Sequence, residues 1–170
     1  YKKGFTYEKI SPNIEKRITG KSYRKNNNIK LSDLRYVQVL HYGFDGKVKE
    51  GELIVNKKIA KKTVKVFYAL YQKRYRIERM RLIDDYGAND EKSMAANNTS
   101  AFNYRVISGT TKLSNHSYGM AIDINPRINP WVKGTKVSPA NGKVYKQRKT
   151  SKCKGKYKRY MIHKNDTAYK

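Results

Sequence analysis

Apolar residues recur with helical spacing in the middle of the first half of the chain. Between residues 57 and 73, Ala60, Val64, Phe67 and Tyr71 fall at i, i+4, i+7 and i+11, and most of the residues between them are lysines or other polar residues. This spacing places the apolar side chains on one face of a helix and the charges on the other. The pattern predicts an amphipathic helix over 57–73.

A shorter helix is predicted near the N-terminus. Ser11 is a favourable N-cap, Pro12 suits the first helical position, and Gly20 is a typical helix end. The apolar residues of this segment again recur every four positions, at Ile10, Ile14 and Ile18.

Alternating or continuous apolar runs predict strands over 34–42 and 51–56, joined across an Asp-Gly turn. Further strands are predicted over 76–84, 102–108 and 120–125, whereas 85–100 is polar and predicts a long irregular loop. The fold class expected from this order is α+β, with a small antiparallel sheet and flanking helices. We expect a single domain over 1–170, of which 1–35 form a helical and loop extension.

Composition agrees with a globular domain and adds one strong feature. The chain has 170 residues, 38% of them hydrophobic, and no apolar run approaches the roughly 20 residues of a transmembrane helix. Its single cysteine, Cys153, excludes an internal disulfide and a multi-cysteine zinc site. The formal net charge of +26 predicts attraction to polyanions: nucleic acid, anionic lipid or the teichoic acids of a bacterial wall.

The charge is concentrated in residues 143–159, which contain nine Lys or Arg and no acidic residue. Tyr145 and Tyr157 lie among these cations and could stack on nucleic-acid bases. A solvated loop in a lysine-rich protein explains the same composition, and charge alone does not separate the two interpretations.

The stretch SNHSYGMAID carries the candidate chemistry. His116 and Asp123 flank Gly119, which permits a turn, and in a strand over 120–125 Asp123 would share one face with the small Ala121. Imidazole and carboxylate are both good zinc ligands. The spacing alone also fits a structural histidine beside a glycine.

The complete string Ser114-x-His116-x-x-Gly119-x-Ala121-x-Asp123 resembles the SxHxxGxAxD signature of the zinc D-alanyl-D-alanine carboxypeptidases. That family includes VanY-like carboxypeptidases and L-alanoyl-D-glutamate endopeptidases. The similarity extends over most of the chain from about residue 36 onward, and it implies a hedgehog/D,D-peptidase-like fold.

The resemblance implies a role for several residues. His116 and Asp123 would bind Zn²⁺, and Arg105, in FNYR, would contact the substrate and stabilise the oxyanion. Ser114 would touch substrate or form the local turn, and Arg105 could instead be an ordinary surface arginine. The implied substrate is a peptidoglycan stem peptide, which places the protein outside the cytoplasm, secreted or in the cell wall, with anionic wall polymers as further partners.

The sequence departs from the family after Asp123. The family's third ligand and general base lie in a later GGDW…HF segment, which is missing here, and residues 124–170 contain no glutamate. His163 with Asp166, and His41, are the remaining candidates, and their positions do not match those of family ligands. We therefore expect that the natural protein continues past Lys170 and that this continuation completes the site.

Two other functions fit the same sequence. A catalytically incomplete module of this fold would bind the cell wall or another polyanion without turnover. A specific nucleic-acid binder built on 143–159 is ranked last, because charge does not explain the SxHxxGxAxD string.

Overall fold

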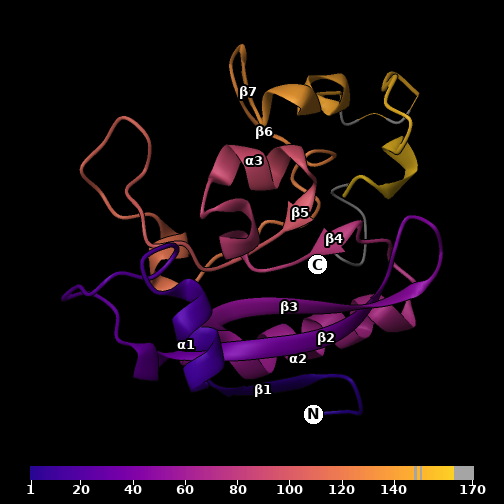
Figure 1. Ribbon diagram of the computed structural model, residues 1–170. Coiled ribbons are helices and arrows are strands. Elements are labelled where there is room, and N and C mark those ends of the chain that lie inside the picture. The colour runs from indigo at the N-terminus through magenta and orange to yellow at the C-terminus, as the bar shows by residue number, and fades with distance from the viewer. Residues whose placement is uncertain (148, 150, 163–170) are drawn as a thin grey trace.

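A computed structural model describes residues 1–147, 149 and 151–162. Its centre is a three-stranded antiparallel sheet of β1 (Thr6–Lys9), β2 (Leu34–Tyr42) and β3 (Val48–Asn56), in the order β1-β2-β3 (Figure 1). The strand predicted at 34–42 is confirmed, and the one predicted at 51–56 begins three residues earlier. Together with the helices around the sheet, this confirms the α+β fold class.

The helix α2 (Lys57–Gln72) packs on one face of the sheet. Asn56, the last residue of β3, caps it by accepting a hydrogen bond at its side-chain oxygen from the backbone N–H of Lys58 at 3.0 Å. The predicted apolar stripe is buried against the strands: Ala60, Val64 and Phe67 are all at most 1% exposed. The prediction of a helix over 57–73 is therefore confirmed.

The helix α1 (Pro12–Ile18) packs on the opposite face. The Ser11 hydroxyl caps it by accepting a hydrogen bond from the Ile14 N–H at 3.4 Å. Ile18 is fully buried in a second apolar cluster with Leu34, Ile54 and residues from the later half of the chain.

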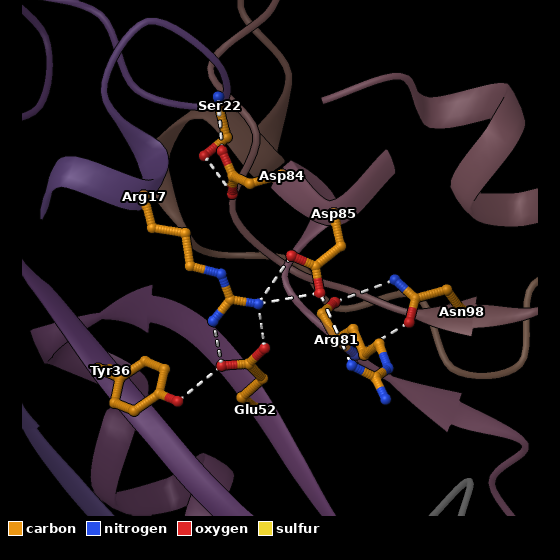
Figure 2. A network of polar contacts seen from close by, with 8 residues as sticks. All are labelled: Arg17, Ser22, Tyr36, Glu52, Arg81, Asp84, Asp85 and Asn98. Atoms are coloured by element: carbon orange, nitrogen blue, oxygen red, sulfur yellow. Dashed lines mark hydrogen bonds and ion pairs between the residues drawn. The ribbon is translucent and has the colours of Figure 1, made fainter. Parts of the chain in front are cut away.

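A network of polar contacts joins α1 to the rest of the molecule (Figure 2). The Arg17 guanidinium donates to both oxygens of Glu52 at 2.8 and 2.5 Å and to Asp85 at 2.8 Å, while the Tyr36 hydroxyl donates to Glu52 at 2.6 Å. Burial raises the pKa of Glu52, but the hydrogen bonds from Arg17 and Tyr36 outweigh burial and lower it overall. The N-terminal segment is thus attached to the sheet through charge-assisted hydrogen bonds as well as through strand β1.

The remaining elements are short. They are α3 (Asp90–Ala95), the parallel pair β4 (Arg79–Met80) and β5 (Asn98–Thr99), and the hairpin of β6 (Trp131–Lys133) and β7 (Lys136–Ser138). Single 3₁₀ turns lie at Leu31–Asp33, Ile83–Tyr86, Asn115–Tyr118, Ala140–Tyr145 and Lys158–Tyr160.

Three strand predictions in this second half are wrong in extent. Only 79–80 of the predicted 76–84 is a strand; 102–108 has one isolated bridge, and 120–125 pairs only at Asp123. The predicted loop at 85–100 contains α3 and β5.

Buried asparagine side chains are the physical reason that the strand predicted over 76–84 is short. The Asn98 side-chain oxygen accepts the Arg81 N–H at 2.9 Å, and that of Asn125 accepts the Glu78 N–H at 3.0 Å. The backbone N–H groups of Arg81 and Glu78 therefore donate to side chains and are not available to hydrogen-bond with a neighbouring strand.

Candidate functional site

The SNHSYGMAID stretch folds as a 3₁₀ turn closed by a glycine. The Ser114 hydroxyl accepts the His116 N–H at 3.3 Å, and Gly119 ends the turn in the left-handed conformation, with φ of +64°. A Cβ on Gly119 would lie 2.7 Å from the backbone nitrogen of Asn56, whose N–H donates to the Gly119 carbonyl at 2.9 Å. Glycine is therefore required here by both conformation and space.

The turn brings His116 and Asp123 together. The His116 Nδ1 lies 2.6 Å from the Ala101 carbonyl oxygen, to which only a protonated Nδ1 can donate. The other ring nitrogen, Nε2, lies 3.3 Å from Asp123 Oδ2. The His116 side chain is 14% exposed and that of Asp123 43%, so the pair lies at the surface with a backbone-fixed imidazole.

A backbone carbonyl on the far ring nitrogen is the usual arrangement around metal-binding histidines, because it fixes the tautomer and the ring orientation. The pair His116–Asp123 accordingly offers two metal donors of the types that zinc prefers. Asp123 is itself held by two backbone hydrogen bonds to Ser100, at 2.9 and 3.2 Å.

A strand over 120–125 would place Met120, Ile122 and Ile124 on the face opposite Asp123, and the two isoleucines follow this expectation. Ile122 and Ile124 pack against the apolar core beneath the sheet, while the Asp123 carboxylate faces His116. Met120 does not follow the expectation: it is 43% exposed, because the chain is still leaving the turn there.

Arg105 is held beside this pair by contacts that the sequence did not reveal. Its Nε forms an ion pair with Asp90 Oδ2, and the Asn103 side chain donates to the other Asp90 oxygen at 2.9 Å. The Arg105 N–H and carbonyl both bind the Ser117 hydroxyl, at 2.9 and 2.6 Å. Burial lowers the pKa of Arg105, and the negative charge of Asp123 acts in the opposite direction.

Asp90 and Ser117 are therefore the supporting residues that sequence reasoning missed. Ser117 lies at an unconstrained position of the signature string, and Asp90 lies in the segment predicted to be irregular. The sequence does contain a signal for Asp90, because this residue lies in the first turn of α3, where acidic residues are favoured. The helix begins after Asn89, whose side chain accepts the Lys92 N–H at 2.9 Å. Two roles were suggested for Ser114, contact with the substrate and formation of the local turn. Its side chain is 6% exposed and makes the hydrogen bond that forms the turn.

In residues 1–147, 149 and 151–162, no three His, Cys, Asp or Glu side chains come together to hold a metal ion. His41 is buried in β2, where its Nδ1 lies 3.0 Å from the Ile77 carbonyl and burial lowers its pKa. His163 and Asp166, the other candidates considered, lie outside the described residues.

One of the comparisons with known proteins found a match. A family model described as D-alanyl-D-alanine carboxypeptidase matches residues 108–162, about a third of the chain. The match includes Ser114, His116 and Asp123 and begins after Arg105. No curated protein and no solved structure matches the chain. The family match supports a D-alanyl-D-alanine carboxypeptidase-like peptidase at the level of the family.

Proposed function

We propose that this protein is a zinc-dependent peptidase that hydrolyses peptidoglycan stem peptides next to a D-amino acid. The observation that carries the proposal is the approach of His116 Nε2 to Asp123 Oδ2 at 3.3 Å, with the other ring nitrogen bound to a backbone carbonyl. The family match over 108–162 is independent support, because it covers both residues.

In this proposal His116 and Asp123 are two of the zinc ligands, and the bound ion supplies Lewis-acid activation of water and of the scissile carbonyl. Arg105, oriented by Asp90, binds the substrate carboxylate or the oxyanion as a fixed cation. The third ligand and the general base would have to come from residues outside those that the structure describes.

The substrate places the protein outside the cytoplasm, in the cell wall or secreted. A net charge of +26 would hold such an enzyme on an anionic wall. Where the structure describes the chain, no helix has the length and apolar character needed to cross a membrane.

The test uses protein expressed from the complete natural gene. Zinc-dependent release of D-alanine from a stem peptide ending in D-Ala-D-Ala is measured for the wild type, His116→Ala and Asp123→Asn. Because removing a supporting contact of a metal ligand already costs about 10- to 100-fold, loss of a ligand is expected to cost at least about 100-fold. Glu8→Gln, which removes one exposed carboxylate from β1, is the charge-matched control and is expected to retain full activity.

A second candidate function is a module of this fold that binds the wall without cleaving it. The observation in its favour is that the described residues bring together no three metal-binding side chains. Saturable binding of the stem peptide with no cleavage of any of its peptide bonds at any zinc concentration would select this function and exclude the peptidase.

A further inference from the structure

The structure has a hollow that is separate from the candidate site, because none of His116, Asp123 and Arg105 lines it. It has a volume of about 920 Å³ and lies between the turn joining β2 to β3, strand β4, and residues 156–159 near the end of the described chain. In Figure 1 the β2–β3 turn and the yellow residues of this last segment lie on the same side of the molecule. We call this hollow the hairpin groove.

Cationic side chains come from every wall of the hairpin groove. They are Lys49 of β3, Arg79 of β4, Arg81 just after β4, and Lys156 and Arg159 of the last segment. In the part of the chain that the structure describes, no carboxylate lies within ion-pair distance of Lys156 or Arg159. Arg79 and Arg81 each form a long ion pair of 3.9 Å, to Glu78 and Asp85 respectively.

Three carboxylates also line the hairpin groove, but two of them are already neutralised. Asp45 binds Lys49 at 3.0 Å, and Glu78 accepts from Arg127 at 2.9 Å and from the Asn97 side chain at 2.8 Å. Glu50 is the third. His41 adds no charge at neutral pH, because burial lowers its pKa. The hairpin groove therefore carries more cations than carboxylates, and these cations come from separate segments of the chain.

The aromatic residues of the hairpin groove contact one another. The Phe44 ring lies 4.7 Å from that of Tyr157 and 4.8 Å from that of Tyr160, measured between centroids. Lys156 and Arg159 lie over the Tyr157 and Tyr160 rings at 5.5 and 4.9 Å.

Tyr145, the other tyrosine suggested for base stacking, is only 6% exposed and packs in the same cluster. Base stacking needs an open ring face. The interpretation of Tyr145 as a base-stacking platform is therefore wrong. Tyr157 lines the hairpin groove, with its ring against that of Phe44 and beneath the Lys156 ammonium.

We propose that the hairpin groove binds the backbone of a polyol-phosphate polymer of the bacterial wall. Guanidinium groups recognise phosphate through paired hydrogen bonds, and a polymer without bases needs no open aromatic face. The choice of a wall polymer rests on the proposed function, whereas the preference for phosphodiesters over bases rests on the groove alone. Binding here would tether the protein to its anionic substrate matrix without occupying the candidate peptidase site.

The test measures the affinity of the wild-type chain for fluorescent poly(glycerol phosphate) over a series of salt concentrations. The groove variant is Lys156→Gln/Arg159→Gln, in which both replaced side chains are exposed. The control is Lys61→Gln/Lys65→Gln, which removes the same charge from the exposed face of α2. We expect the groove variant to bind about tenfold more weakly. The slope of the logarithm of its binding constant against the logarithm of salt concentration is expected to become shallower by roughly 1.4, at about 0.7 for each of two lost phosphate contacts. The control is expected to change affinity less than about twofold.

Arg79→Gln/Arg81→Gln, which removes two further cations that line the hairpin groove, is expected to reproduce the loss, and a melting curve of each variant checks that it is folded. Equal losses in the groove and control variants would overturn the proposal, because net charge would then explain binding. Single-stranded DNA of equal charge is the competing ligand. If it binds as tightly and depends equally on Lys156 and Arg159, the partner is a nucleic acid and the proposal fails. None of these measurements depends on zinc or on hydrolysis. The proposal for the hairpin groove and the proposed peptidase function can therefore be refuted separately.

Discussion

The sheet with α2, residues 34–72, and the site region, residues 97–125, are stabilised in different ways. The first is regular secondary structure around an apolar core that includes Val37, Leu53 and Phe67. The second has two residues of β-strand and one 3₁₀ turn, yet it is well buried. Its buried side chains include eight polar ones: Asn97, Asn98, Thr99, Ser100, Asn103, Ser114, Ser117 and Asn125.

This difference follows from where backbone hydrogen bonds go. In the sheet and in α2, backbone N–H and C=O groups bond to one another between strands or along the helix. The side chains of the core can therefore be apolar. In the site region the chain bends too often for ladders, and buried backbone groups must find side-chain partners. The positions of His116 and Arg105 thus depend on individual hydrogen bonds, which specify geometry more narrowly than apolar contacts do.

The largest effect is expected in the apolar region. Phe67→Ala removes a ring that is 1% exposed between α2 and the sheet, and a cavity of this kind typically costs about 3–5 kcal/mol. Urea unfolding measures the loss. Val66→Ala, at a neighbouring residue that is 43% exposed, is the control and is expected to cost no more than about 0.5 kcal/mol. A small effect of Phe67→Ala would show that α2 does not stabilise the fold.

A pair of glycine substitutions separates backbone strain from close packing in the site region. Gly109 and Gly119 both have positive φ, +76° and +64°, but only Gly119 has backbone atoms where a Cβ would lie. Gly109→Ala is expected to cost about 1–2 kcal/mol from conformation alone. Gly119→Ala is expected to cost more, by about 1 kcal/mol or above, because the turn must move away from Asn56. Equal unfolding free energies would contradict the close approach.

Ser117→Ala tests the polar stabilisation directly. Its hydroxyl binds both the N–H and the carbonyl of Arg105, so its loss leaves buried backbone groups unsatisfied at a cost of about 1–3 kcal/mol. We expect faster amide hydrogen exchange in residues 102–118 and unchanged exchange in α2. Ser108→Ala, at an exposed position, is the control. Uniformly faster exchange across the chain would mean that the two regions open together.

The smallest expected effect is a pH dependence of the Arg17–Glu52 network. Because the folded pKa of Glu52 is lowered, its contribution is fully present above the unfolded pKa of about 4.3 and is lost as the pH falls through the folded value. Glu52→Gln is expected to cost about 1–2 kcal/mol at pH 7 and progressively less below pH 4. Urea unfolding at several pH values measures this. A cost that does not change with pH would mean that hydrogen-bond geometry, and not charge, holds α1.

The sequence by itself determined the elements whose side-chain pattern is local. Helix α2 and strand β2 follow from apolar periodicity, and the Ser114–Gly119 turn follows from a cap residue and a glycine in the right order. The proximity of His116 and Asp123 was suggested by the signature string alone, although the strand expected to carry Asp123 reduces to one bridge with Ser100.

Only the tertiary structure decided what holds those residues in place. The His116 ring is fixed by the carbonyl of Ala101, and Arg105 by Asp90 from α3. A backbone carbonyl carries no side-chain signature, and an ion pair between residues 15 positions apart leaves no periodic pattern. Likewise, the charge of residues 143–159 was evident from composition. That two of its cations line one groove with Arg79 and Arg81, and that the Tyr157 ring contacts Phe44, depends on how distant segments pack.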